Sequence, residues 1–396
     1  MSDHLPLARM RVIDLTRVLS GPFCSMILAD LGAEVIKVET PGEGDPVRAQ
    51  GDMRDGLSWY FASFNRNKKS ITLNLRDPAA RDILRKLLTD ADAVVENYRP
   101  DVMAAMGFGP EELAKINPRL VSGSISGFGA TGPYKDRPSF DFIAQAMSGF
   151  MSLNGPEGTP PVRAGNPISD LAAGLYCALG VVSLLLRRER GGAAGAASTS
   201  LTGAMIGMLG FAAANHLATG KLPPRTGNDH PVASPYGMFR TSDGEIAIAP
   251  PGEAMYRRLL NALDAEELAG RPEFATNADR FANRAAINAE IEARTMRHTT
   301  AHWIDVLNAG GVPCGPVMNL AEVFADPQNI AQPVTAALDH PGYGMVEMLT
   351  TPLRIDGAVP PLRTPSPGLG EHTDEVLGAL GIAGEEIATL RARGVI

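Results

Sequence analysis

The 396-residue chain has few of the residues that mark secreted or metal-binding proteins. Cysteine occurs three times, as Cys24, Cys177 and Cys314, and no two have Cys-x-x-Cys spacing. Widely spaced thiols in apolar surroundings predict a reducing, cytoplasmic compartment and no disulfide framework. His298 and His302 stand four residues apart on a predicted helix, but no glutamate follows His298. We therefore expect a solvated helix face there and no metal site.

Long hydrophobic segments are also missing. The longest apolar run, residues 171–186, has 16 residues. A membrane-spanning helix needs about 20, so we interpret this run as a buried helix and expect no membrane association. The first ten residues contain no apolar segment of signal-peptide length, and we expect no secretory or transit peptide.

Basic residues are fewer than acidic residues. The chain has 36 Lys and Arg against 44 Asp and Glu, a formal net charge of −8. This balance argues against nucleic acid as the main partner and leaves small molecules or other protein chains. Hydrophobic residues make up 44% and charged residues 20%, as in ordinary globular proteins, and the length suits two domains.

Two common catalytic signatures are incomplete. The segment Ser20 to Ser25 contains one glycine and no Gly-x-Gly-x-x-Gly, which disfavours an NAD site although Glu39 stands where such a fold places its ribose acid. The segment Gly123 to Gly127 carries Ile125 where a nucleophile elbow needs serine. We therefore expect neither a classical dehydrogenase nor a serine hydrolase.

The pattern that is present predicts an α/β fold. Over the first 125 residues, short β-branched runs alternate with helical patterns, which indicates a Rossmann-like parallel sheet with crossover helices. A Pro-rich linker at 221–225 precedes a hairpin signal and amphipathic helices, so we expect a smaller α+β domain. The predicted organisation is a large domain over 1–220, a small domain with linkers over 221–330, and a segment over 331–396 that returns to the large domain.

Asp170 is the only acidic residue between Glu157 and Glu189, and it begins an almost wholly apolar stretch. A carboxylate at the start of a helix can cap the free N–H groups of the first turn. A carboxylate against an apolar wall can also be a tuned nucleophile, because burial makes its charge costly. Both roles are compatible with the local sequence.

Basic residues gather in or near the predicted loops of the large domain, where phosphates could bind even in an acidic protein. They are Lys37, Arg48, Arg66, Lys68, Lys69, Arg76, Arg99 and Arg137.

Several stretches together resemble the class III coenzyme A transferase family (CaiB/BaiF type), the superfamily that includes formyl-CoA transferases and α-methylacyl-CoA racemases. The matching stretches are SGP (20–22), LADLGAEVIKVE (28–39), NRNKKSI (65–71), ENYRP (96–100), GFGATGP (127–133), FDFIAQ (140–145), SDLAAG (169–174), GVPCGP (311–316) and LGEHT (369–373). They occur in family order and cover essentially the whole chain.

The resemblance implies a Rossmann-like large domain, a small domain and an interlocked homodimer. It also implies that Asp170 is the nucleophile of a double displacement that passes through an aspartyl anhydride and an aspartyl-CoA thioester. Coenzyme A and acyl-CoA would then be substrates, together with a carboxylic acid, and no cofactor would be bound permanently. An anhydride and a thioester are both activated acyl groups, so such a transfer needs no ATP.

The resemblance further assigns residues to the substrates. Coenzyme A contacts are implied for Leu19, Ser20, Leu73, Asn74, Arg76, Asn97, Tyr98, Arg99 and Arg137. Phe140 and Asp141 would border the thioester. Thr40 stands where relatives often carry an arginine for the phosphates, and Arg48 or Arg76 would replace it.

Two departures from the family patterns bear on the reaction. Racemases place a histidine before the position of Asp141, and this chain has Phe140, so proton exchange is disfavoured. The glycine-rich lid of formyl-CoA transferases is not visible over residues 228–234, which argues against formyl and oxalate specificity. We therefore expect a CoA-transferase that uses a donor such as succinyl-CoA and small (di)carboxylic acids. An acyl-CoA racemase or epimerase and a non-catalytic CoA-binding protein are the alternatives.

Overall fold

The computed structural model describes residues 4–396, which form two compact units. The first unit comprises the described residues up to Phe150, together with Ala164–Gly210 and Ala331–Ile396, and the second comprises Met151–Arg163 and Phe211–Ile330. The sequence placed residues 151–163 and 211–220 in the large domain, whereas in the structure they belong to the second unit. The returning C-terminal segment does belong to the first unit.

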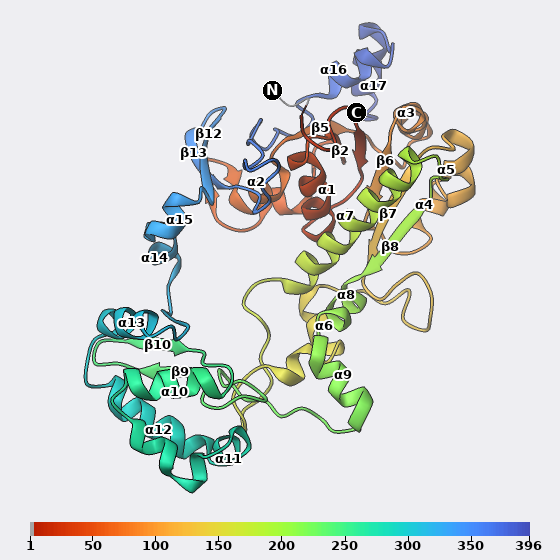
Figure 1. Ribbon diagram of the computed structural model, residues 1–396. Helices are drawn as coiled ribbons and strands as arrows, with labels where there is room; N and C mark the ends of the chain where they lie inside the picture. Colours follow the sequence, from red (N-terminus) through yellow and green to blue (C-terminus); the bar gives the residue numbers. More distant parts are fainter. Residues whose placement is uncertain (1–3) are drawn as a thin grey trace. The chain divides into compact units, whose positions relative to one another are not determined.

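The first unit is built on a six-stranded sheet in which every paired strand is parallel (Figure 1). The strand order is β5 (Lys68–Thr72), β2 (Glu34–Glu39), β1 (Arg11–Asp14), β6 (Ala93–Glu96), β7 (Val121–Ser126) and β8 (Ala196–Ser200). The predicted parallel sheet is thus confirmed. The chain winds outward from β1 in one direction and then from β6 in the other. The carboxyl ends of β1 and β6 therefore border the switch point at which doubly wound sheets bind ligands.

Alternate side chains of the strands pack on opposite faces of the sheet. Val12 and Val35 belong to one hydrophobic core, and Ile13 and Ile36 belong to the other. The first core is covered by α1 (Ser20–Asp30), α6 (Asp141–Met147), α7 (Ile168–Glu189) and α8 (Leu201–Gly207). The second core is covered by α3 (Pro78–Thr89), α5 (Pro110–Ile116), α16 (Thr373–Ala379) and α17 (Gly384–Ala392).

Helix α7 is longer than the apolar run that predicted it. It has 22 residues, and among residues 4–396 it is the one unbroken helix whose length and composition would allow it to cross a membrane. One side of the helix, including Cys177, Val181 and Leu185, packs into the core beside α1 and the sheet. The opposite side carries exposed apolar residues, so the helix is buried on one side only.

Shorter elements and the C-terminal return complete the first unit. The short elements are β3 (Met53–Arg54), β4 (Leu57–Ser58), α2 (Trp59–Asn65), α4 (Val102–Ala105) and the hairpin of β12 (Thr335–His340) with β13 (Gly344–Leu349). The chain then passes beside β5, where the backbone N–H of Arg363 donates to Asn67 and that of His372 donates to Ser70.

The second unit contains a three-stranded antiparallel sheet of β11 (Cys314–Pro316), β10 (Glu245–Ile248) and β9 (Gly237–Arg240). The hairpin that the sequence predicted after the 221–225 linker is therefore present, formed by β9 and β10. The helices are α9 (Gly210–Thr219), which begins at the unit boundary, α10 (Glu253–Ala262), α11 (Asn277–Ala282), α12 (Arg284–Thr295), α13 (Thr300–Ala309), α14 (Leu320–Ala325) and α15 (Pro327–Ala331). Their core is centred on Tyr256, Leu259, Ile291 and Trp303.

Candidate active site

Asp170 lies in the first turn of α7, two residues after its first residue, Ile168. The residue before the helix is Pro167, whose side chain cannot accept a hydrogen bond. Asp170 itself is half-buried and accepts a hydrogen bond from the Ser20 side chain on α1. Asp170 is therefore not the cap of the helix, and that part of the sequence interpretation is wrong.

The contact between Asp170 and Ser20 depends on a close crossing of α1 and α7. Gly174 lies one turn after Asp170, and a Cβ atom at Gly174 would stand 2.7 Å from the backbone oxygen of Ser20. Real Cβ contacts are essentially never that short. The missing side chain therefore lets the two backbones meet and brings the first residue of α1 to the carboxylate of Asp170.

The protonation of Asp170 is strongly perturbed. Burial, and then the negative charge of Asp141, raise its pKa from 3.8 to about 7, while the Ser20 hydrogen bond acts in the opposite direction. The first turns of α1 and α7 also favour the anion, because helix N-termini carry partial positive charge. Asp170 is thus a shielded carboxylate that changes its charge near neutral pH.

Asp141 is the first residue of α6, and its side chain is 7% exposed. Its Oδ1 accepts hydrogen bonds from the backbone N–H of Ser169 at 2.9 Å and from the Ser169 hydroxyl at 2.8 Å. Its Oδ2 accepts one from Nε2 of Gln145 at 2.7 Å. Protein donors thus engage both carboxylate oxygens of Asp141. The neighbouring Phe140 is 69% exposed, so the pair predicted to border the thioester has two very different environments.

A cleft of about 860 Å³ opens at the switch point of the sheet. Five of the predicted coenzyme A contacts line it, namely Leu73, Asn74, Arg76, Tyr98 and Arg99. Asn97 is not among the lining residues, and its side-chain amide is paired with the backbone N–H and carbonyl of Arg17, which does line the cleft, at 2.9 and 2.8 Å. Leu19 and Ser20 lie at the start of α1, and Arg137 lies on an exposed loop, stacked on Tyr134.

The sequence interpretation missed two arginines of the cleft, Arg17 and Arg81. Arg17 follows β1 by three residues, and this position beyond a strand's carboxyl end was a usable signal. Arg81 lies in the first turn of α3 and does not directly follow a strand. Its place in the cleft therefore depends on how the chain folds after the Leu73–Arg76 segment.

Five of the eight predicted basic residues are committed to ion pairs. They are Lys37 with Asp45, Arg48 with Glu39, Arg66 with Asp30, Lys68 with Asp14, and Lys69 with Glu34 and Glu375. Arg48 contacts both carboxylate oxygens of Glu39 at 2.8 Å and lies over the ring of Phe61. Arg48 is therefore a poor replacement for the phosphate-binding arginine that relatives carry at the position of Thr40. The exposed Arg76 lines the same cleft as Thr40 and suits this role better. Glu39 is equally committed, so it is no free acid for a ribose.

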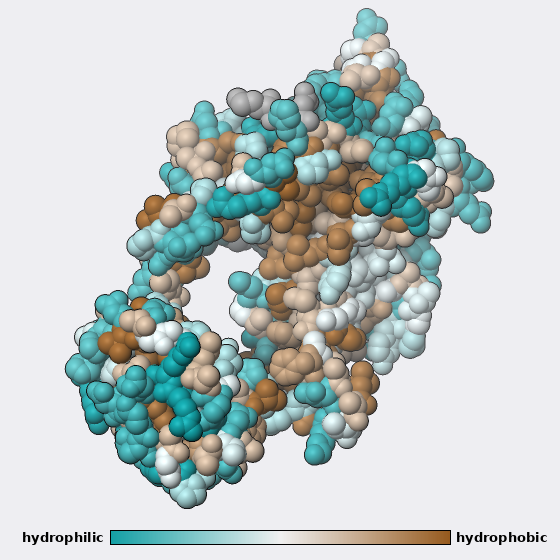
Figure 2. All heavy atoms as spheres, in the orientation of Figure 1, coloured by the Kyte–Doolittle hydropathy of each residue, from teal (hydrophilic) through white to brown (hydrophobic). Residues whose placement is uncertain are grey.

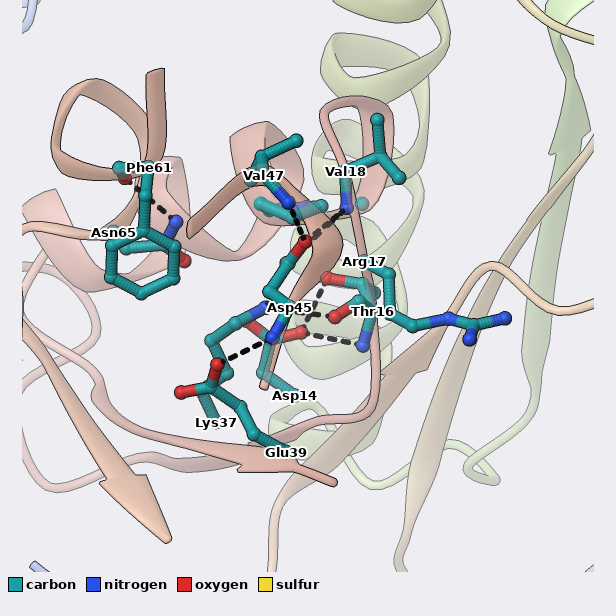
Figure 3. Close-up of polar contacts among 12 residues, drawn as sticks. Asp14, Thr16, Arg17, Val18, Lys37, Glu39, Asp45, Val47, Phe61 and Asn65 are labelled. Atoms are coloured by element: carbon teal, nitrogen blue, oxygen red, sulfur yellow. Dashed lines mark hydrogen bonds and ion pairs between the residues drawn. The ribbon is translucent and has the colours of Figure 1, made fainter. Parts of the chain in front are cut away.

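The loop between β1 and α1 rests on a buried network of charges (Figure 3). Asp45 accepts the backbone N–H groups of Val18 and Val47, pairs with Lys37 at 2.9 Å, and donates its own N–H to Glu39. Val18 has a φ of 70°, a left-handed conformation that costs a β-branched residue about 1–3 kcal/mol. The network holds the loop in this strained shape just before Ser20.

A second buried pair lies below this loop. Lys68 Nζ contacts Asp14 at 3.0 Å and also bonds to the carbonyl of Pro22 and the side chains of Ser25 and Asn65. Burial opposes the charge of Asp14, but Lys68 and Lys37 outweigh it and lower its pKa to about 2. The first turn of α1 is thus anchored to β1 and β5 through charged hydrogen bonds.

Within residues 4–396, no cluster of three His, Cys, Asp or Glu side chains is arranged to hold a metal ion. The rings of His298 and His302 lie 4.1 Å apart and pack against Trp303. His298 lies in the turn between α12 and α13, so the prediction that both histidines share one helix is wrong.

A doubly wound sheet, a large cleft at its switch point and a shielded carboxylate at a helix start are the architecture of a nucleotide-binding α/β enzyme. The model of CoA-transferase family III matches residues 7–373. The chain therefore belongs to CoA-transferase family III, as its sequence motifs predicted, and is a CoA-transferase.

Relatives support this assignment over nearly the whole length. The chain is 41% identical to an acetyl-CoA:oxalate CoA-transferase of Acetobacter aceti, over 93% of this chain and 94% of that protein. It is 37% identical to the human succinyl-CoA:glutarate CoA-transferase, over 95% of this chain and 86% of that protein. The crystal structure of a CaiB/BaiF family protein from Brucella suis superposes with a TM-score of 0.83 at 38% identity, covering 95% and 99% of the two chains.

Proposed function

We propose that this enzyme transfers coenzyme A from an acyl-CoA to a small carboxylic acid, with Asp170 as the nucleophile. The observation that carries the proposal is the environment of Asp170. Burial and Asp141 raise its pKa to about 7, and it accepts a hydrogen bond from Ser20. A carboxylate that is shielded from water and costly to ionise becomes more stable when it is acylated.

In the proposed reaction, Asp170 attacks the thioester carbonyl, the C–S bond breaks, and coenzyme A thiolate leaves a mixed anhydride on the enzyme. The thiolate then attacks the Asp170 carbonyl carbon and releases the donor acid, which leaves an aspartyl-CoA thioester. The acceptor carboxylate attacks that thioester to form a second anhydride and free thiolate. Attack of this thiolate on the acceptor's carbonyl gives the new acyl-CoA and restores Asp170. The bonds balance without a further reactant.

We assign the coenzyme A moiety to the cleft at the switch point. Arg76 and Arg99 suit its phosphates, and Leu73, Asn74 and Tyr98 supply the remaining walls. Leu19 and Ser20, at the start of α1, would receive the pantetheine end, and Asn97 would hold the backbone of Arg17, which lines the cleft. Arg137 and Phe140 remain proposed contacts near the thioester. The side chain of Phe140 has no titratable group, so the racemase alternative lacks a second base at this position.

The acids are proposed from the relatives. Their names include glutarate and oxalate as acceptors, and succinyl-CoA and acetyl-CoA as donors. The sequence argued against oxalate because no glycine-rich lid was visible. A relative named for oxalate is 41% identical to this chain, so we no longer exclude oxalate on that basis. We therefore propose small dicarboxylic acids, oxalate included, with succinyl-CoA as the first donor to test. A matrix of donors against acceptors would identify the pair.

We also propose that the enzyme is a homodimer in which a second copy covers the apolar side of α7. Helices α6, α7 and α8 contact one another, and Figure 2 shows hydrophobic side chains gathered over α7. Their exposed apolar residues are Phe142, Ile143, Met147, Leu175, Tyr176, Leu179, Leu186 and Ile206. A contiguous apolar surface of this kind marks a protein interface.

Sedimentation velocity tests the dimer. Leu179→Glu on α7 should yield monomers, whereas the control change Leu222→Glu, at a leucine of the linker that is even more exposed (82% against 63%), should leave the dimer intact. A monomeric wild-type protein would refute this part of the proposal.

The mechanism is tested by mass spectrometry of the intact protein after brief incubation with succinyl-CoA. The wild-type enzyme should carry covalent coenzyme A, and Asp170→Asn should carry none. Asp90→Asn is the matched control, because Asp90 is exposed at the end of α3. Full acyl transfer by Asp170→Asn would overturn the assignment of the nucleophile.

A further inference from the structure

The start of α7 is held by a residue from another helix. Pro167 precedes the helix and has no side-chain acceptor, so the free N–H of Ser169 needs a partner elsewhere. Oδ1 of Asp141 on α6 accepts this N–H at 2.9 Å and the Ser169 hydroxyl at 2.8 Å. Asp141 therefore performs the capping role that the local sequence suggested for Asp170.

Asp141 is itself locked in place. Nε2 of Gln145 donates to its Oδ2 at 2.7 Å, and Oε1 of the same Gln145 accepts the backbone N–H of Ala164 at 2.9 Å. One side-chain amide thus ties Asp141 to the segment that leads into α7. The position of the residue after Ser169, which is Asp170, follows from these contacts.

The charge of Asp141 acts on Asp170 with little compensation. The titratable side chain that faces the pair from α2 is Tyr60, whose pKa is raised to about 12 by burial and by Asp170, Asp45 and Asp141. Helix α1 contributes Cys24 and, at its far end, Asp30, which is paired with Arg66. Helix α8 contains no titratable residue. Lys68, which bonds to the first turn of α1, is paired with Asp14. Among the described residues, the charged side chain that shifts the pKa of Asp170 is thus Asp141.

We propose that Asp141 is a positioning residue that fixes the first turn of α7 and keeps a negative charge beside Asp170, so that acylation of Asp170 is favoured. This inference rests on the proposed function. Acylation turns the Asp170 carboxylate into a neutral anhydride or thioester, and the repulsion between the two carboxylates then disappears. Asp141 therefore biases the enzyme toward its covalent intermediates, because it makes the free anion less stable.

Asp141→Asn keeps the shape of the side chain and an oxygen that can accept the Ser169 N–H, but removes the charge. The rate of covalent adduct formation with saturating succinyl-CoA should rise with pH around a midpoint near 7 in the wild-type enzyme. In Asp141→Asn the midpoint should fall by about one pH unit, and the fraction of enzyme acylated at equilibrium should fall several-fold. Burial also raises the pKa of Glu96 to about 7, and Glu96 accepts a hydrogen bond from the backbone N–H of Tyr98, a residue that lines the cleft. The assay uses saturating succinyl-CoA so that an effect of Glu96 on substrate binding does not contribute to the measured midpoint.

Two further variants separate charge from packing. Gln145→Met removes a donor to Asp141 but keeps the charge, so its midpoint should rise or stay rather than fall. Asp90→Asn should match the wild-type profile. An unchanged midpoint in folded Asp141→Asn would overturn the proposal.

If Asp141→Asn does not fold, Gln145→Met provides the test, and a lowered midpoint of its pH profile would overturn the proposal. Activity retained by Asp170→Asn would instead refute the proposed nucleophile, so the two failures are distinct.

Discussion

Replacement of Asp170 by asparagine should stabilise the protein while abolishing its activity. In the folded chain the pKa of Asp170 is raised to about 7 from 3.8 by burial and Asp141. Because one pKa unit corresponds to about 1.4 kcal/mol, ionised Asp170 costs the folded state about 4 kcal/mol. The two helix N-termini favour the anion by about 0.3–1 kcal/mol each. We expect a net gain of about 2–4 kcal/mol for Asp170→Asn at pH 8.

The sign of the effect follows from where the proton is bound. Below pH 3.8 the carboxyl is protonated in both states, and the cost is absent. Between 3.8 and about 7 the unfolded chain loses its proton while the folded chain keeps it, so the cost grows with pH and is complete above about 7. At pH 5 the advantage of Asp170→Asn should therefore shrink to about 1–2 kcal/mol.

Urea unfolding of both proteins at pH 5 and pH 8 measures this difference. Asp141→Asn is the informative contrast at pH 5, where Asp170 is protonated in the folded state and no repulsion is relieved. Because Asp141→Asn loses a charged acceptor for three hydrogen bonds, it should be less stable than the wild type at that pH. An Asp170→Asn protein no more stable than the wild type at pH 8 would show that Asp170 is not held in a costly ionised form.

Three other outcomes are expected. The rate of covalent adduct formation should rise with pH through about 7, because the attacking form of Asp170 is the anion. Gly174→Ala should lower activity at least about tenfold and cost about 1–3 kcal/mol, since its Cβ would strike the Ser20 carbonyl and separate α1 from α7. Arg76→Ala should raise the KM for acyl-CoA, most strongly at low salt, whereas Arg48→Ala should mainly lower the melting temperature.

The predictions for Gly174 and Arg76 have control variants in the chain. Gly384→Ala, where nothing lies within 4 Å of the added Cβ, should be neutral, and equal losses at Gly174 and Gly384 would contradict the close crossing. An Arg48→Ala variant that raises the KM as much as Arg76→Ala would show that Arg48 reaches the phosphates despite its pairing with Glu39. A flat pH profile at saturating acyl-CoA would contradict the titration of Asp170.

The general architecture followed from local patterns. Alternating β-branched runs and helical periods predict a parallel sheet, because each strand must return to the same edge through a crossover helix. Motifs spread over the whole chain predicted the family, which the comparisons confirm. The cleft also follows from strand ends, since Leu73, Tyr98 and Arg99 all stand just after strands.

The use of individual charges did not follow from local patterns. Arg48 and Arg76 look alike as basic residues in loops, but one is bound to Glu39 and the other faces the cleft. Asp141 and Asp170 both stand in the first turn of a helix, but only Asp141 serves as a cap. Residues 151–163 cluster with the second unit although they lie between segments of the first. These distinctions depend on partners far away in sequence.

The sequence by itself therefore determined the order of the elements, the family and the identity of the shielded acid, because these depend on residue types and short-range periodicity. Only the tertiary structure decided which carboxylate caps α7, that the pKa of Asp170 is raised to about 7, and which cations remain available in the cleft. Burial and charge interactions act through space, so the protonation of Asp170 depends on α1 and α6 rather than on its own neighbours in the chain.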